Sequence, residues 1–162
     1  MKRYRCAVVP GSFDPITVGH LDLIKRACGM FDTVYVTAFR NAEKHGMFME
    51  EEKLHMMRLA VKDLPNAVCS VEDGVLADFA KAHNAVIVKG LRNGTDFDYE
   101  TSLAYINRAI ADAETVFLPA SQEYLHISSS YVREMLRYHG DFSKAVPEAV
   151  WLYLTKEWKP KQ

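Results

Sequence analysis

The chain has 162 residues, 49% hydrophobic and 25% charged, with a formal net charge of −1 at pH 7. This length can bury the core of one compact domain, so we expect a single domain over residues 1–162. The nearly balanced charge argues against a broadly basic surface that coats nucleic acid.

Short apolar segments alternate with amphipathic ones along the chain. Strands are predicted near Tyr4–Pro10, Thr33–Phe39, Ala67–Val71, Ala85–Lys89 and Thr115–Pro119. Helices are predicted from about Thr17, from Glu50, over Val75–His83 and Asp96–Asp112, from Ser129 to His139 before Gly140, and over Pro147–Thr155, with residues 156–162 poorly anchored. This order predicts an α/β fold with a doubly wound, five-stranded parallel sheet.

The turn after the first strand is the most informative segment. Its sequence, from Pro10 to His20, places Gly11 where the backbone can approach a ligand closely. A helix that begins near Thr17 directs unpaired N–H groups and its positive dipole end at this turn, which suits a phosphate. His20 then lies near a bound anion, although a lone histidine can equally be structural.

Other polar residues are expected at the same edge of the sheet, because ligands of open parallel sheets bind beyond the carboxyl ends of the strands. Lys89 ends one strand, and the loop after Pro119 follows another. Asp96 and Glu100 are one helical turn apart, where they could hold a cation, orient Arg92 or meet a ribose. The serines at 128–130 suit a helix N-cap, and the same N–H groups could bind a triphosphate.

Cysteines and apolar runs bear on the cellular compartment. The three cysteines, Cys6, Cys28 and Cys69, are widely separated and predict neither a disulfide framework nor a zinc site. The N-terminal segment does not resemble a signal peptide, and no stretch approaches the roughly 18 apolar residues of a membrane span. We therefore expect a cytoplasmic protein that binds neither membranes nor nucleic acid.

Three motifs together resemble one enzyme family. The segment from Gly11 to His20 matches G-[ST]-F-D-P-x-T-x-G-H, Lys89–Glu100 is similar to R-G-L-R-x-x-x-D-F-[ED]-Y-E, and Ile127–Ser130 matches I-S-S-S. These motifs resemble phosphopantetheine adenylyltransferases, of the nucleotidyltransferase superfamily with a T-x-G-H or H-x-G-H motif. The resemblance implies a Rossmann-like nucleotidyltransferase fold and transfer of AMP from ATP to 4′-phosphopantetheine, giving dephospho-coenzyme A and pyrophosphate by direct in-line attack.

The resemblance also implies individual roles. His20 would stabilise the transition state, and Lys44 would contact the acceptor and the transferring phosphate. The implied ATP-binding residues are Ser12, Phe13, His20, Gly90, Leu91, Arg92, Glu100, Tyr124, Leu125, His126, Ile127, Ser128, Ser129 and Ser130. The implied 4′-phosphopantetheine-binding residues are Ser12, Lys44, Leu76 and Lys89. Mg²⁺, a homohexamer and coenzyme A as a feedback ligand are further implications, whereas the metal ligands are not indicated.

Two positions depart from the family pattern. Lys89 stands where arginine is usual, which keeps the charge but loses the bidentate fork. His45 and Gly46 replace residues of the usual K-K-P-M-F loop.

Other functions remain alternatives. A mononucleotide adenylyltransferase of pyridine-nucleotide synthesis shares the opening motif, but prefers H-x-G-H where this chain has Thr17. A cytidylyltransferase is disfavoured because an R-T-x-G-I-S-T-T-like stretch is absent from the sequence. A non-catalytic sensor of adenine nucleotides or coenzyme A is disfavoured because it would not need both His20 and Lys44.

Overall fold

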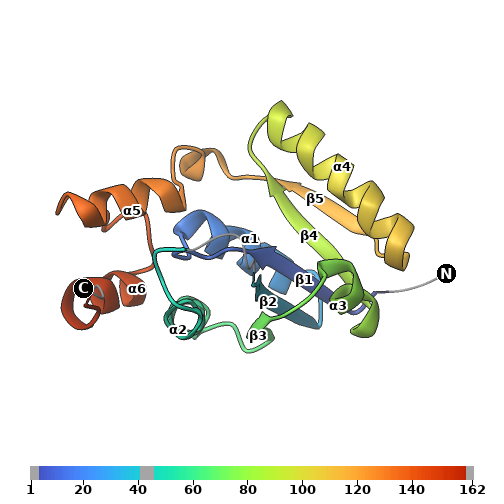
Figure 1. The fold of residues 1–162 in the computed structure, drawn as a ribbon, viewed down its shortest axis with the longest axis horizontal. Helices are drawn as coiled ribbons and strands as arrows, with labels where there is room; N and C mark the ends of the chain where they lie inside the picture. The colour runs from blue at the N-terminus through green and yellow to red at the C-terminus, as the bar shows by residue number, and fades with distance from the viewer. Residues whose placement is uncertain (1–3, 41–45, 160–162) are drawn as a thin grey trace.

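The computed structural model describes residues 4–40 and 46–159. Five parallel strands form one sheet in the order β3-β2-β1-β4-β5 (Figure 1). They are β1 (Cys6–Gly11), β2 (Thr33–Phe39), β3 (Ala67–Glu72), β4 (Ala85–Leu91) and β5 (Thr115–Pro119). The predicted α/β class and five-stranded parallel sheet are confirmed.

Helices connect and flank the strands. They are α1 (Val18–Cys28), α2 (Glu50–Ala60), α3 (Leu76–Ala82), α4 (Gly94–Ala111), α5 (Ser129–Arg137) and α6 (Glu148–Leu152). A 3₁₀ turn, η1 (Gln122–Tyr124), precedes α5, and a π-helical turn, η2 (Tyr153–Glu157), follows α6. The sheet therefore carries helices on both faces, as Figure 1 shows.

Alternation along the strands divides the core between the two faces. Val9 points to the cluster shared with α1, α2, α5 and α6, whereas Val8 points to the cluster shared with α3 and α4. Val36 and Tyr35 of β2 alternate in the same way. Burial on both sides explains why the central strands are continuous apolar runs rather than alternating ones.

The strand order places a topological switch point between β1 and β4. The chain proceeds outward from β1 through β2 to β3 and then returns to the other side of β1 with β4 and β5. Connections diverge between β1 and β4, and the carboxyl ends of these strands therefore leave an open crevice for a ligand.

Several predicted helix boundaries differ from the structure by one or more residues, and for two of them the cause is visible. Helix α4 begins at Gly94 rather than Asp96, because the Asn93 side chain accepts the Asp96 N–H at 2.9 Å and caps the helix. Helix α5 ends at Arg137 rather than His139. Tyr138 is the C-cap, and His139 takes the left-handed φ of 56° that ends the helical path before Gly140, whose N–H donates to the Met135 carbonyl at 2.8 Å.

The C-terminal segment is better anchored than its composition predicts. The indole Nε1 of Trp158 donates to Glu52 Oε1 at 2.9 Å, and its ring lies 5.0 Å from that of Phe48. The prediction that residues 156–162 are poorly anchored is thus wrong for Trp158, because its partners Glu52 and Phe48 lie in a distant part of the sequence.

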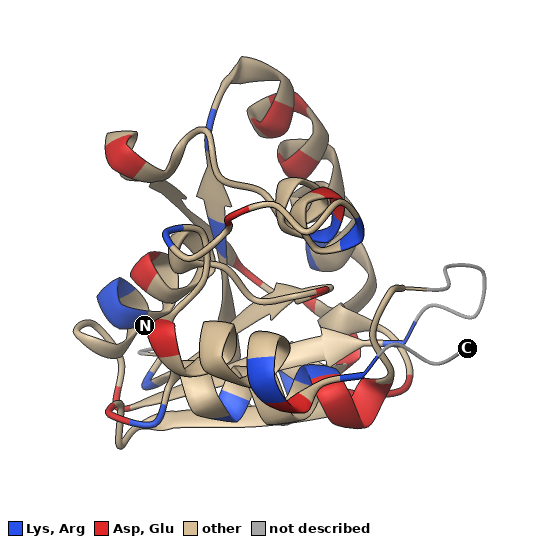
Figure 2. Ribbon diagram, turned by 90° about the vertical axis from the view of Figure 1, so that its left-hand side faces the viewer, with Lys and Arg blue, Asp and Glu red and all other residues tan. Residues whose placement is uncertain are grey.

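The charged residues of both signs are distributed over the molecule. Figure 2 shows basic and acidic residues interspersed over the elements that it displays. Within the part of the chain that the structure describes, no helix has the length and apolar character needed to cross a bilayer.

Candidate active site

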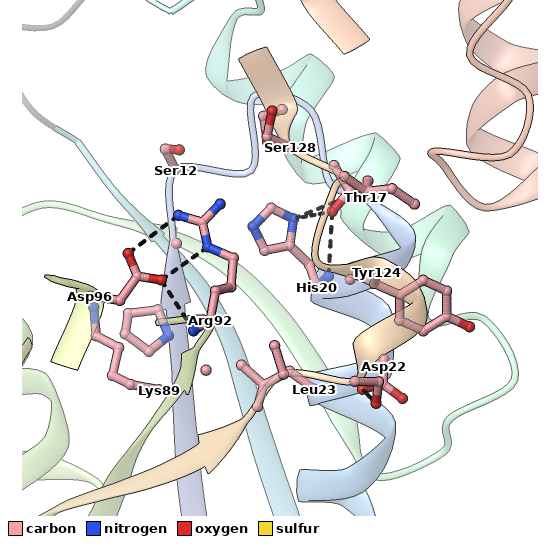
Figure 3. Close-up of a pocket in the computed structure, with 18 of the residues that line it drawn as sticks. Ser12, Thr17, His20, Asp22, Leu23, Lys89, Arg92, Asp96, Tyr124 and Ser128 are labelled. Carbon is pink, nitrogen blue, oxygen red and sulfur yellow. Dashed lines mark hydrogen bonds and ion pairs between the residues drawn. The ribbon is translucent and has the colours of Figure 1, made fainter. Parts of the chain in front are cut away.

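A pocket of about 450 Å³ opens at the carboxyl ends of β1 and β4, at the switch point of the sheet. Its walls come from the turn after β1, the start of α1, the β4–α4 connection and the segment from β5 to α5 (Figure 3). It brings together most of the predicted site residues: Ser12, His20, Lys89, Gly90, Arg92, Glu100, Tyr124, Ile127, Ser128, Ser129 and Ser130.

The remaining predicted residues lie elsewhere. Phe13 is fully buried in the main core, whereas Leu125 and His126 are exposed and do not line the pocket. Leu91 lies beside the pocket, where its carbonyl accepts the Ala120 N–H at 2.8 Å. Leu76 packs in the core cluster on the α3 side of the sheet. Lys44 lies outside the described residues.

The capping of α1 sets the orientation of His20. Thr17 is the N-cap, and its backbone N–H donates to His20 Nδ1 at 3.0 Å. Thr17 Oγ1 is also 3.0 Å from Nδ1, so that its hydroxyl can donate to the same atom. Because Nδ1 accepts, the proton of the neutral ring must be on Nε2, which becomes a donor for a ligand.

The electrostatics of the pocket keep His20 neutral. Burial, aided by the positive charge of Arg92, lowers the pKa of His20 to about 4. Desolvation and a nearby cation both penalise the imidazolium form. At neutral pH the ring can therefore stabilise developing negative charge as a hydrogen-bond donor without itself changing protonation state.

Phe13 supports this histidine from the core. Its ring meets the His20 ring edge to face, with centroids 5.2 Å apart. A Cβ on Gly11 would lie 2.9 Å from Phe13 Cζ, so the space beside this glycine is taken by an aromatic ring. The close approach predicted at Gly11 therefore includes an intramolecular partner, besides any ligand in the pocket.

Arg92 is held by a carboxylate on the first turn of α4. Its Nε donates to Asp96 Oδ2 at 2.9 Å, and its Nη2 donates to Oδ1 at 3.4 Å (Figure 3). Hydrogen bonding from Arg92 lowers the pKa of Asp96. Three roles were considered for Asp96: to hold a cation, to orient Arg92 or to contact a ribose. The structure shows the second, since Asp96 accepts hydrogen bonds from the Arg92 side chain.

Lys89 is paired with the next carboxylate along the same helix face. Its Nζ lies 3.0 Å from Glu100 Oε2 and 3.3 Å from Oε1, and both side chains are partly buried. The two cations therefore enter the pocket as ion pairs. An anionic ligand would bind them in competition with Asp96 and Glu100.

The serine segment caps α5. Ser128 Oγ accepts the Tyr131 N–H at 3.1 Å, and Ser129 Oγ donates to the Pro15 carbonyl at 2.8 Å. The N-cap interpretation of this segment is confirmed. Because all three serines also line the pocket, the helix N-terminus is available to an anion.

Sequence reasoning missed a group of polar lining residues on α1 and α5. Asp22 accepts from Ser121 Oγ at 2.7 Å, and Arg26 donates to the Pro119 carbonyl at 2.7 Å. Arg133, one turn into α5, also lines the pocket. The i, i+4 spacing of Asp22 and Arg26 is visible in the sequence, but the sequence does not show which face of α1 meets β5.

The acidic residues of the pocket do not form a metal site by themselves. Among residues 4–40 and 46–159, no group of three or more histidine, cysteine, aspartate or glutamate side chains is placed to hold a metal ion. The carboxylates of Asp96 and Glu100 are already paired with cations. A divalent ion here would thus depend on ligand oxygens and water.

Comparison with known proteins agrees with the geometry of the pocket. Residues 8–135 match the cytidylyltransferase-like family. The phosphopantetheine adenylyltransferase of Thermobifida fusca is 44% identical over 147 residues, covering 90% of each chain. That of Levilactobacillus brevis is 44% identical over 146 residues, covering 89% of this chain and 91% of the relative.

A solved structure shares the fold. It is a candidate nicotinate-nucleotide adenylyltransferase from Vibrio parahaemolyticus, with a TM-score of 0.65 over 94% of this chain and 100% of that one. At 20% identity this likeness concerns the fold alone. Because the T-x-G-H motif, the pocket and the 44% identity across nine-tenths of the chain agree, the chain belongs to the phosphopantetheine adenylyltransferase family.

Proposed function

We propose that this chain transfers the AMP group of ATP to the phosphate of 4′-phosphopantetheine, releasing pyrophosphate and forming dephospho-coenzyme A. The observation that carries the proposal is the neutral His20, whose Nε2–H is left for the pocket by the contacts of Nδ1 with Thr17. An oriented donor of this kind stabilises charge that develops on a transferring phosphoryl group.

Direct attack of the acceptor phosphate on the α-phosphorus accounts for the remaining groups. Arg92 and Lys89 supply positive charge at the carboxyl end of β4, and the N-terminus of α5 supplies N–H donors for the leaving phosphates. Ser128 and Ser129 bond to backbone groups rather than to a base, so neither is activated as a nucleophile. Binding two phosphates in line is then the main task of the protein.

Mg²⁺ is proposed to enter with ATP. The pocket provides carboxylates in ion pairs rather than a protein metal cage. This donor set fits an ion coordinated mainly by phosphate oxygens and water, which would neutralise charge on the leaving pyrophosphate.

The test compares three acceptors with ATP. Pyrophosphate release is measured with 4′-phosphopantetheine, nicotinate mononucleotide and glycerol 3-phosphate. Turnover with the first alone supports the proposal. Release with nicotinate mononucleotide and none with 4′-phosphopantetheine would favour the pyridine-nucleotide alternative, and nucleotide binding without any turnover would favour a sensor.

A homohexamer and feedback by coenzyme A are also proposed, on the family resemblance. The outer face of α4 supplies an apolar surface for self-association, since Tyr105, Ile106 and Ile110 are 70%, 53% and 55% exposed. Light scattering of the wild type and of Ile110→Asp tests assembly: we expect a hexamer and a smaller species, respectively. Competition of coenzyme A with 4′-phosphopantetheine in the turnover assay tests feedback.

A further inference from the structure

We propose that Asp14 is a positioning residue that sets the use of the acceptor, by holding residues 46–48 against the turn between β1 and α1. The inference rests on the proposed function, in which Lys44, two residues before Gly46, contacts the acceptor. Asp14 itself does not line the pocket.

The contacts of Asp14 are those of a buried anchor. Its residue is 6% exposed, and its two carboxylate oxygens accept two consecutive backbone N–H groups at 3.0 Å each, Met47 N–H on Oδ2 and Phe48 N–H on Oδ1. Hydrogen bonds to an ionised carboxylate are stronger than neutral ones, and leaving such a buried group unpaired is costly. The segment is therefore tied firmly to the turn after β1.

Gly46 fits this anchor by lacking a side chain. A Cβ at this position would lie 2.8 Å from Asp14 Oδ1 and 3.0 Å from Cγ. A larger residue would have to displace either the carboxylate or the segment. The unusual glycine of this loop thus allows the close approach on which the two hydrogen bonds depend.

On the side away from Asp14, the segment contacts Trp158, in the C-terminal part of the chain. Phe48 is 3% exposed and packs against Trp158, whose indole N–H donates to Glu52. The second oxygen of Glu52 accepts the Met49 N–H at 2.7 Å. Residues 46–49 are consequently held from both sides, and Asp14 provides the contact on the side of the turn.

The other partner of Asp14 belongs to the pocket. Arg133 Nη1 donates to the Asp14 carbonyl at 2.6 Å and lies 3.5 Å from Oδ2, while its Nη2 donates to Ser130 Oγ at 3.0 Å. Asp14 therefore joins residues 46–48 to the wall that carries the serines. Asp14→Asn removes the 3.5 Å ion pair with Arg133 but leaves the 2.6 Å hydrogen bond from Arg133 to the Asp14 carbonyl in place. We therefore expect it to perturb residues 46–48, which lose a direct hydrogen bond, more than the ATP site.

Two variants test the assignment. Asp14→Asn keeps the volume but presents an NH₂ group to a backbone N–H, and Gly46→Ala keeps the carboxylate but pushes the segment away. For each we expect the KM for 4′-phosphopantetheine to rise about 10-fold while the KM for ATP stays within about 3-fold. Gly29→Ala is the control, because Gly29 has ordinary αR geometry and its added Cβ would lie 3.4 Å from the nearest backbone oxygen.

The outcomes separate this inference from the proposed function. Wild-type protein without turnover on 4′-phosphopantetheine overturns both. Normal wild-type turnover, with both KM values unchanged in the two variants or raised equally, overturns the positioning role alone. Melting temperatures are measured alongside, and if Asp14→Asn does not fold, the KM split of Gly46→Ala decides.

Discussion

The Nδ1 atom of His20 accepts the backbone N–H of Thr17 at 3.0 Å, across one turn of helix. Thr17 is the N-cap of α1 and His20 is its third helical residue, so the T-x-G-H spacing is also the spacing of a capping box. The segment Thr17–His20 thus begins the helix, fixes the tautomer of His20 and leaves its Nε2–H for the pocket.

Replacing His20 with alanine should lower kcat by about 10²–10³, the usual effect of losing one transition-state donor, with little change in ATP affinity. Steady-state pyrophosphate release and calorimetry with ATP measure the two quantities. His83→Ala, at the C-cap of α3, is the control and should retain kcat. Near wild-type turnover of His20→Ala would remove His20 from the chemistry.

Stability should depend on pH through His20. Its pKa is about 4 in the folded chain, and about 6.5 is expected after unfolding. As pH falls from about 6.5 to about 4, the unfolded chain binds a proton that the folded chain does not, so the free energy of unfolding decreases. The melting temperature of His20→Asn should fall less than that of the wild type over this window. Parallel curves would contradict the lowered pKa.

Lys89 should tolerate arginine but not alanine. Lys89→Arg retains the charge for an acceptor phosphate and should preserve activity, whereas Lys89→Ala should raise the acceptor KM. The alanine variant also leaves Glu100 without its cation, 3.0 Å away in the wild type. Adding Glu100→Gln to it separates that repulsion from lost phosphate binding: an acceptor KM that returns to normal would exclude a direct role for Lys89.

Leu76→Asp tests the acceptor arm. Leu76 starts α3 and packs on the sheet face opposite α1, outside the pocket at β1 and β4. If the pantetheine arm extends along Leu76, a carboxylate there should raise the KM for 4′-phosphopantetheine and leave ATP binding intact, because burying it is costly. Met30→Asp, at an exposed position, is the control. An unchanged acceptor KM would place the arm elsewhere.

Local sequence determined the features that depend on neighbouring residues. Apolar runs marked all five strands, because both faces of this sheet are covered. The Thr17–His20 spacing determined the capping of α1, and the Asp96–Glu100 spacing placed two carboxylates on one face of α4, where both line the pocket. Several contacts within the motifs that indicated a nucleotide site are therefore local: Thr17–His20, Arg92–Asp96 and Ser128–Tyr131 each join residues three or four positions apart.

Tertiary structure decided which distant groups meet. Arg133 and Asp14 are 119 positions apart, and Trp158 and Glu52 are 106 apart, so neither contact has a local signal. In the folded chain His139, rather than Gly140, takes the left-handed conformation after α5. Leu76 packs on the face of the sheet opposite α1. Spacing within an element specifies which face a residue occupies, but the partner of that face is set only when the layers pack around the sheet.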